Sequence, residues 1–259
     1  MYYILDLLSY KMSQPVAFSH INESWFQYLA TLLWLVFMVY AFIKYKGINE
    51  DKLTRIIFSV GLLILTFELY KQIVFTYDAM SFQWYAFPFQ FCSTPMYTMV
   101  IQRFTRGRIK TALWTYLQTY GFFAGVAVML YPISVFHPII GINIQTMVHH
   151  GGMAYIGFLL ILIHRPSIKA FMDGTIVFIC VTILAVIMNS LFNLSGNPST
   201  FNMFFLNPKF DSHIPVISLF QDHVSWITYD LIFLLGFIFI GYIMLMFNYA
   251  WHKKALKIV

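Results

Sequence analysis

Long apolar runs, separated by short polar stretches, dominate the pattern of this 259-residue chain. A run of about 20 apolar residues is long enough to cross the hydrocarbon core of a membrane as an α-helix. The third run is the shortest and most polar, and the last is the longest. We therefore predict an all-α fold, a bundle of seven transmembrane helices over residues 25–43, 56–77, 86–102, 111–131, 145–163, 175–193 and 225–249.

The composition indicates that lipid, and not water, surrounds most of the protein. Hydrophobic residues make up 60% of the chain and charged residues only 10%, whereas a soluble domain carries about 25% charged residues. No segment is long and polar enough to form a separate soluble domain. We expect residues 1–259 to form a single transmembrane domain of a multi-pass membrane protein.

The basic residues lie in alternate connections between the predicted helices. Lys and Arg gather in the cytoplasmic loops of membrane proteins, so this bias predicts an external N-terminus and a cytoplasmic C-terminus. It also accounts for the net charge of +6, and we expect no nucleic-acid partner because neither a basic arm nor an RNA-binding aromatic motif is present. Thirteen of the sixteen basic residues fall in this set: Lys44, Lys46, Lys52, Arg55, Arg103, Arg106, Arg108, Lys110, Arg165, Lys169, Lys253, Lys254 and Lys257.

Two connections on the predicted outer side, residues 131–145 and 194–223, are rich in Pro, Gly and Asn and yet apolar. We expect them to lie along the membrane surface or to fold over the mouth of the bundle. They would then act as a lid or as passive interfacial loops.

Polar side chains from five predicted helices fall at one level, near the outer face of the bundle. An ionisable residue within a span is costly in lipid, so it usually faces the bundle interior and marks a site or a pathway. The one-sided distribution predicts a single polar chamber that opens toward the outer leaflet. Its candidate residues are Glu68, Gln90, Cys92, Ser93, His149, His150, Asn189, Asn193, His223 and Asp230.

Cys92 is the candidate nucleophile. A thiol beside an imidazole can lose its proton, and the resulting thiolate attacks carbonyl esters. The alternative is a small buried hydrophobic residue, which is our interpretation of Cys180, and no disulfide is expected. Amides and hydroxyls of the type that stabilises a developing oxyanion are supplied by Gln90, Ser93, Asn189 and Asn193.

The adjacent histidines differ in direction. Side chains of neighbouring residues on a helix point about 100° apart, so we expect only one of His149 and His150 to face the chamber. That imidazole is the candidate general base, and the other packs against it or orients it. Glu68 has Lys71 one turn away, so a local ion pair is the alternative to a role in the chamber.

Two motifs resemble a known family. The segment WYAFPFQFCSTPMY and the histidine pair in MVHHGGMAYIG resemble the YwaF-like family of bacterial membrane proteins, which is related to the eukaryotic transmembrane-protein-164 acyltransferases. The stretch NSLFNLSGNPSTFNMFFLNP is similar as well, and the resemblance covers the chain from about the second predicted helix to the seventh. It implies thiol-dependent transfer of fatty acyl chains between lipids, in a bacterial plasma membrane. Cys92 would be the nucleophile and one of His149 and His150 the base.

Three functions are compatible with these residues. The first is a lipid acyltransferase or acyl-ester hydrolase without a cofactor, with membrane lipids as partners and His223 or Asp230 orienting the base. The second is a metal-dependent intramembrane hydrolase, with zinc among the imidazoles and carboxylates. The third is a non-enzymatic transporter or lipid-binding protein, in which Glu68 and Asp230 couple to protons. The oligomeric state is left open.

Overall fold

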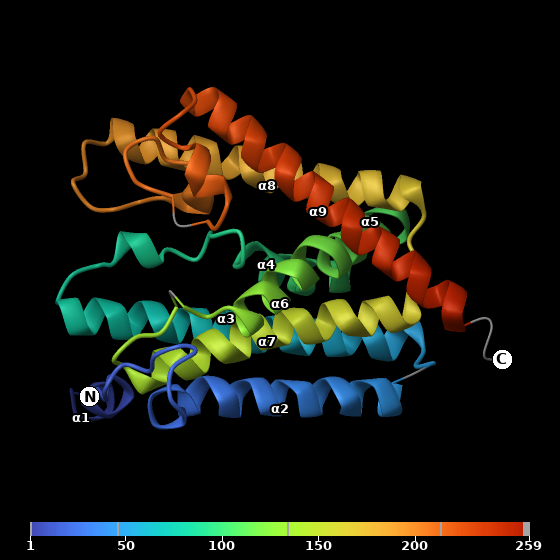
Figure 1. Ribbon diagram of the computed structural model, residues 1–259, viewed down its shortest axis with the longest axis horizontal. Coiled ribbons are helices and arrows are strands. Elements are labelled where there is room, and N and C mark those ends of the chain that lie inside the picture. The colour runs from blue at the N-terminus through green and yellow to red at the C-terminus, as the bar shows by residue number, and fades with distance from the viewer. Residues whose placement is uncertain (1, 46, 134, 213, 256–259) are drawn as a thin grey trace.

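The computed structural model describes residues 2–45, 47–133, 135–212 and 214–255, which form a bundle of helices (Figure 1). Within these ranges no strand occurs, and the fold is all-α as predicted. Lys46 and Lys257, two of the basic residues that indicate the topology, lie outside the described residues.

Six helices among the described residues are long and apolar enough to cross a membrane. They correspond to six of the seven predicted spans, and each covers its predicted span to within one residue while most extend several residues beyond it. They are α2 (Ile21–Tyr45), α3 (Glu50–Ala79), the continuous helix α5–η3–α6 (Gly107–Leu130), α7 (Ile140–Ile163), α8 (Ile168–Leu194) and α9 (Trp226–Ala255).

The third predicted span, 86–102, is not a continuous helix. The segment holds the short helix η1 (Trp84–Ala86), a series of turns, α4 (Thr94–Ile101) and η2 (Gln102–Phe104). The eight residues of α4 cover about 12 Å, too little to cross a bilayer. Pro88 has no backbone N–H to donate, and Pro95 lies in the first turn of α4, where a helix tolerates proline, so the regular helix starts late.

The broken segment runs back through the middle of the bundle. In Figure 1 it lies between α3 and α7 on one side and α8 and α9 on the other, together with α5 and α6. The connections after α2, α4 and α7 lie at the same end as the C-terminus, and the N-terminus lies at the opposite end (Figure 1). The basic connections therefore share one end of the bundle, and which side of the membrane that end faces stays a prediction.

The contact between α6 and α7 is close because both helices carry small residues there. A Cβ added at Gly125 would lie 2.6 Å from the backbone N of Ala154 and 2.6 Å from the backbone O of His150. A Cβ at Gly157 would lie 2.5 Å from the Cβ of Phe122. Glycine lets helix backbones approach in this way in membranes. The approach fixes the position of α7, which carries the histidine pair.

The long connection between α8 and α9 folds into the bundle. It contains η4 (Met203–Phe205) and η5 (Ile217–Phe220). Phe201, Met203, Phe204 and Leu206 are each at most 3% exposed, because they pack against the rings of α8, α9 and the broken segment. Residues 201–207 of this connection are therefore part of the hydrophobic core, while other parts of it, such as Val216 and Leu219, are exposed.

We expect Gly125→Ala to destabilise the bundle by about 1–3 kcal/mol, because the new methyl group meets backbone atoms that cannot rotate away. Gly236→Ala is the matched control, since its Cβ would meet only the Cδ1 of Ile217 at 3.9 Å. The midpoint of thermal unfolding in detergent measures both variants. Equal midpoints for the two would contradict this account of the α6–α7 contact.

Candidate active site

A polar cavity of about 260 Å³ lies between the C-terminal third of α3, the N-terminal half of α7 and the turn before α4. The end of α3 and the start of α7 lie at the end of the bundle that holds the N-terminus (Figure 1). The lining of the cavity combines residues from the two helices, the broken segment and the 131–139 connection. These are Glu68, Lys71, Phe75, Tyr85, Gln90, Cys92, Ser93, Val135, Phe136, His137, Ile142, Gln145, Thr146, His149 and His150.

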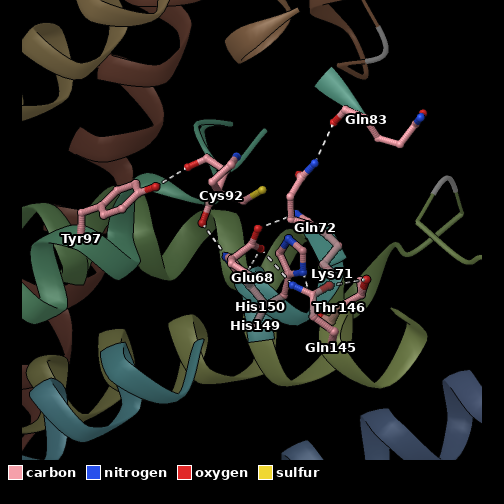
Figure 2. Close-up of polar contacts among 11 residues, drawn as sticks. Glu68, Lys71, Gln72, Gln83, Cys92, Tyr97, Gln145, Thr146, His149 and His150 are labelled. Atoms are coloured by element: carbon pink, nitrogen blue, oxygen red, sulfur yellow. Dashed lines mark hydrogen bonds and ion pairs between the residues drawn. The ribbon is translucent and has the colours of Figure 1, made fainter. Parts of the chain in front are cut away.

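Glu68 is the centre of the polar contacts (Figure 2). Its side chain is 3% exposed. Oε1 accepts a hydrogen bond from Gln145 Nε2 at 2.9 Å and faces His149 Nδ1 at 2.9 Å, while Oε2 pairs with Lys71 Nζ at 2.6 Å. A buried carboxylate is tolerated only with such compensation. The predicted Glu68–Lys71 pair is thus present, and the same carboxylate also belongs to the cavity.

His149 links the carboxylate to the chain at Cys92. Its Nδ1 faces Glu68, and its Nε2 lies 2.9 Å from the backbone carbonyl oxygen of Cys92. Both partners are acceptors, so the ring donates to both only when each nitrogen carries a proton. In this arrangement His149 links α7 to the turn before α4, and both of its ring nitrogens face a partner, so it has no free nitrogen to act as a base.

His150 has the arrangement that a general base needs. Its Nδ1 donates to the backbone carbonyl of Thr146 at 2.8 Å, which leaves the lone pair on Nε2. No partner for Nε2 occurs among the described residues, and the side chain lines the cavity. The structure thus assigns different contacts to the two histidines: His149 is bound at both nitrogens, and His150 presents one free nitrogen.

Cys92 lies in the turn of residues 90–93, just before α4, and also lines the cavity. Figure 2 shows its sulfur on the side of the cavity where the His150 ring and the Lys71 side chain lie. In the described part of the chain the sulfur makes no hydrogen bond to either imidazole. Nucleophile–base contacts are often longer in unliganded sites and tighten when substrate binds.

Gln90 and Ser93 line the same cavity, but the amide of Gln90 is engaged elsewhere. Its Nε2 donates to the carbonyl of Asn202 at 2.9 Å, and its Oε1 accepts from the backbone N–H of Phe204 at 2.9 Å. Gln90 therefore binds the α8–α9 connection through both ends of its amide, and one N–H of its Nε2 is left without a partner among the described residues. Ser93 is 2% exposed and follows the candidate nucleophile directly.

Asn189 and Asn193 do not line the cavity. Asn189 binds the backbone of Met203 at both atoms, donating at 2.9 Å and accepting at 2.8 Å. Asn193 exchanges hydrogen bonds with Asn207 at 2.9 and 3.2 Å. Buried backbone groups in membrane proteins need such partners. These amides satisfy the inserted loop, and they share one face of α8 as their spacing predicted.

His223 and Asp230 also lie outside the cavity lining. His223 is exposed in a turn before α9. Asp230 is half-buried, and its Oδ1 has no hydrogen-bond partner among the described residues. Of the ten predicted polar residues, six share one cavity: Glu68, Gln90, Cys92, Ser93, His149 and His150. Asn189 and Asn193 form a second group on α8, and His223 and Asp230 each lie apart from both groups.

Gln145 and Thr146 are site residues that the sequence interpretation missed. Each lies four residues before one of the histidines, and residues four apart share a helix face. Gln145 thus reaches the carboxylate that His149 faces, and Thr146 supplies the carbonyl for His150. The spacing is the signal that could have found them. His137 reaches the cavity from the 131–139 connection and Tyr85 from the short helix η1, and no comparable spacing rule exists for either.

The donor set for a zinc site does not come together. Within the described ranges no group of three or more His, Cys, Asp or Glu residues is arranged to hold a metal ion. His223 and Asp230, two of the proposed ligands, are absent from the cavity lining. Nothing in this geometry favours the metal-dependent hydrolase.

The sequence was compared with known families and proteins. The model of the TMEM164 family matches residues 17–249, which include every helix that lines the cavity. No curated protein and no solved structure matches the chain.

We expect Glu68→Gln to destabilise the protein by about 3–5 kcal/mol, because it leaves the largely buried ammonium of Lys71 without a counter-charge. Glu50→Gln is the control: its carboxylate pairs with Lys110 but is 67% exposed, so the expected loss is below about 1 kcal/mol. Thermal unfolding in detergent distinguishes them. A Glu68→Gln, Lys71→Met double variant should recover part of the loss, and a double variant no more stable than Glu68→Gln would count against the buried ion pair.

Proposed function

We propose that this chain, which belongs to the TMEM164 family, transfers or hydrolyses the acyl chains of membrane lipids. Cys92 is the nucleophile and His150 the general base. The observation that carries the proposal is that the thiol and a free imidazole nitrogen line one cavity between transmembrane helices. We propose the outer leaflet of a bacterial plasma membrane as the place of action.

The first half-reaction acylates the enzyme. His150 Nε2 takes the proton from the Cys92 thiol, and the thiolate attacks the carbonyl carbon of a lipid ester. The tetrahedral intermediate collapses, the ester C–O bond breaks, and the leaving lysolipid alkoxide takes the proton from His150. The acyl chain is then held as a thioester on Cys92.

The second half-reaction releases the acyl chain. The hydroxyl of an acceptor lysolipid gives its proton to His150 Nε2 and attacks the thioester carbonyl. The C–S bond breaks, and the Cys92 thiolate recovers the proton from His150. With water in place of the acceptor hydroxyl, the same steps release a free fatty acid.

The charged groups around Cys92 position it and stabilise negative charge. His149 holds the carbonyl of Cys92, and Glu68 holds His149. Lys71 lines the cavity with its ammonium group. A fixed positive charge in a site that excludes water stabilises a thiolate and a developing oxyanion more strongly than it would in water.

The depth of the cavity suits a lipid ester. The 30 residues of α3 extend about 45 Å, so a centred helix projects roughly 8 Å beyond each side of a 30 Å hydrocarbon core. Lys71 lies eight residues before the end of α3 at Ala79, about 12 Å along the axis. The cavity is then a few ångströms inside the hydrocarbon boundary, where ester carbonyls lie.

We expect Cys92→Ala to abolish acyl exchange and Cys180→Ala, at an exposed position outside the cavity, to leave it unchanged. The measurement follows labelled acyl chains between a phospholipid and a lysophospholipid in vesicles that contain the purified protein. Acyl exchange that survives in Cys92→Ala would exclude the thiol mechanism. A protein that binds the lipid without any turnover would indicate the binding or transport function instead.

The two histidines should differ in kind. We expect His150→Gln to lower kcat by about 10²–10⁴-fold, the usual contribution of a general base, with little change in thermal stability. We expect His149→Gln to lower both kcat and the unfolding midpoint, because it breaks the link from Glu68 to the Cys92 turn. The pH profile of kcat provides the further readout: its alkaline-side plateau should vanish only in His150→Gln, and its loss in His149→Gln would reverse the assignment.

A further inference from the structure

A second hollow lies at the other end of α3, far along the chain from the candidate active site. Its volume is about 470 Å³. It follows the first turns of α3, next to the end of α2. The lining residues are Asn49, Lys52, Arg55, Ile56, Ser59 and Val60.

The two cations of this hollow have no acidic partner in the described part of the chain. Other basic residues at this end are paired: Lys110 with Glu50 at 2.9 Å and Arg108 with Asp173 at 2.5 Å. Lys52 instead lies over the ring of Tyr45, with Nζ 5.6 Å from the ring centre. Lys52 and Arg55 therefore leave two positive charges available to a ligand.

A hydroxyl group lies beside these cations. Ser59 lines the hollow together with Lys52 and Arg55, and its hydroxyl makes no hydrogen bond among the described residues. A hydroxyl donor and unpaired cations are together the groups that hold a phosphate.

The hollow changes from polar to apolar along α3. Asn49 and Lys52 lie at the start of the helix, and Ile56 and Val60 follow one and two turns further into the bundle. A bound lipid would meet the same order, with its phosphate at the cations and the start of an acyl chain against the two aliphatic residues. Topology alone would explain basic residues at this end, but it requires no hollow.

We propose that this hollow binds the headgroup phosphate of an anionic membrane lipid. Lys52 and Arg55 pair with the phosphate, and Ser59 donates a hydrogen bond to the headgroup. Basic pockets between transmembrane helices bind anionic headgroups in this manner. The site is separate from the acyl-transfer chemistry and does not depend on it.

The test compares two double variants that remove the same charge. Lys52→Gln, Arg55→Gln alters the hollow, while Arg103→Gln, Arg106→Gln alters exposed cations at the same end that do not line it. Native mass spectrometry of the detergent-solubilised protein, titrated with phosphatidylglycerol, gives the binding constant. The first variant should bind about 30-fold more weakly, and the control should bind as the parent does.

Three results would overturn the proposal. The first is that both double variants weaken phosphatidylglycerol binding equally. The second is that phosphatidylcholine binds as tightly as phosphatidylglycerol. The third is that inorganic phosphate at the same concentration binds as well as the lipid. Ser59→Ala, which removes the one hydroxyl in the lining, should weaken phosphatidylglycerol binding a few-fold. Cys92→Ala should bind phosphatidylglycerol as the parent does, which separates this site from the proposed catalysis.

Discussion

A carboxylate buried among membrane helices must find its compensation within the protein, and Glu68 is where this constraint acts. Its two oxygens are satisfied by an ammonium, an imidazole and an amide that come from α3 and α7. The imidazole of His149 extends the link to the carbonyl of Cys92. One charged group thus connects two helices and a turn, because the lipid outside offers no alternative partner. The position of the candidate nucleophile follows from this compensation.

The break in the third predicted span is part of the same arrangement. In a regular helix the carbonyl of Cys92 would accept from the backbone N–H four residues later, and the neighbouring turns would leave it less accessible to a side chain of another helix. In the turn before α4 that carbonyl is free and reaches His149, while the carbonyl of Pro88 accepts from Tyr97 at 2.7 Å. Irregular backbone survives at membrane depth only where the protein satisfies it. Side chains that look catalytic by type are therefore also the partners of unwound backbone.

The sequence predicted what depends on helix length and on the cost of polar groups in lipid. Six spans follow from the apolar runs, and Glu68, Cys92 and the histidine pair share a cavity because buried polar groups of a bundle find one another. The sequence could not predict the inserted loop. An asparagine whose amide binds backbone groups, such as Asn189, looks the same in the sequence as an asparagine that faces a chamber. The break left a signal that was not used: the run at residues 86–102 is the shortest and most polar of the seven and contains Pro88 and Pro95.

The adjacent histidines show why residue type does not decide chemical role. Both imidazoles line the cavity and both belong to α7. The partner four residues earlier differs in what it offers: Gln145 donates to Glu68, whereas Thr146 presents its carbonyl to His150. The carbonyl fixes one proton on His150 Nδ1 and leaves Nε2 able to accept another, while His149 spends both nitrogens on acceptors. A general base needs one free ring nitrogen, as His150 has, and a residue that links two elements needs both nitrogens bound, as in His149. The contacts that each imidazole makes with its surroundings therefore decide which histidine can transfer a proton and which one positions the site.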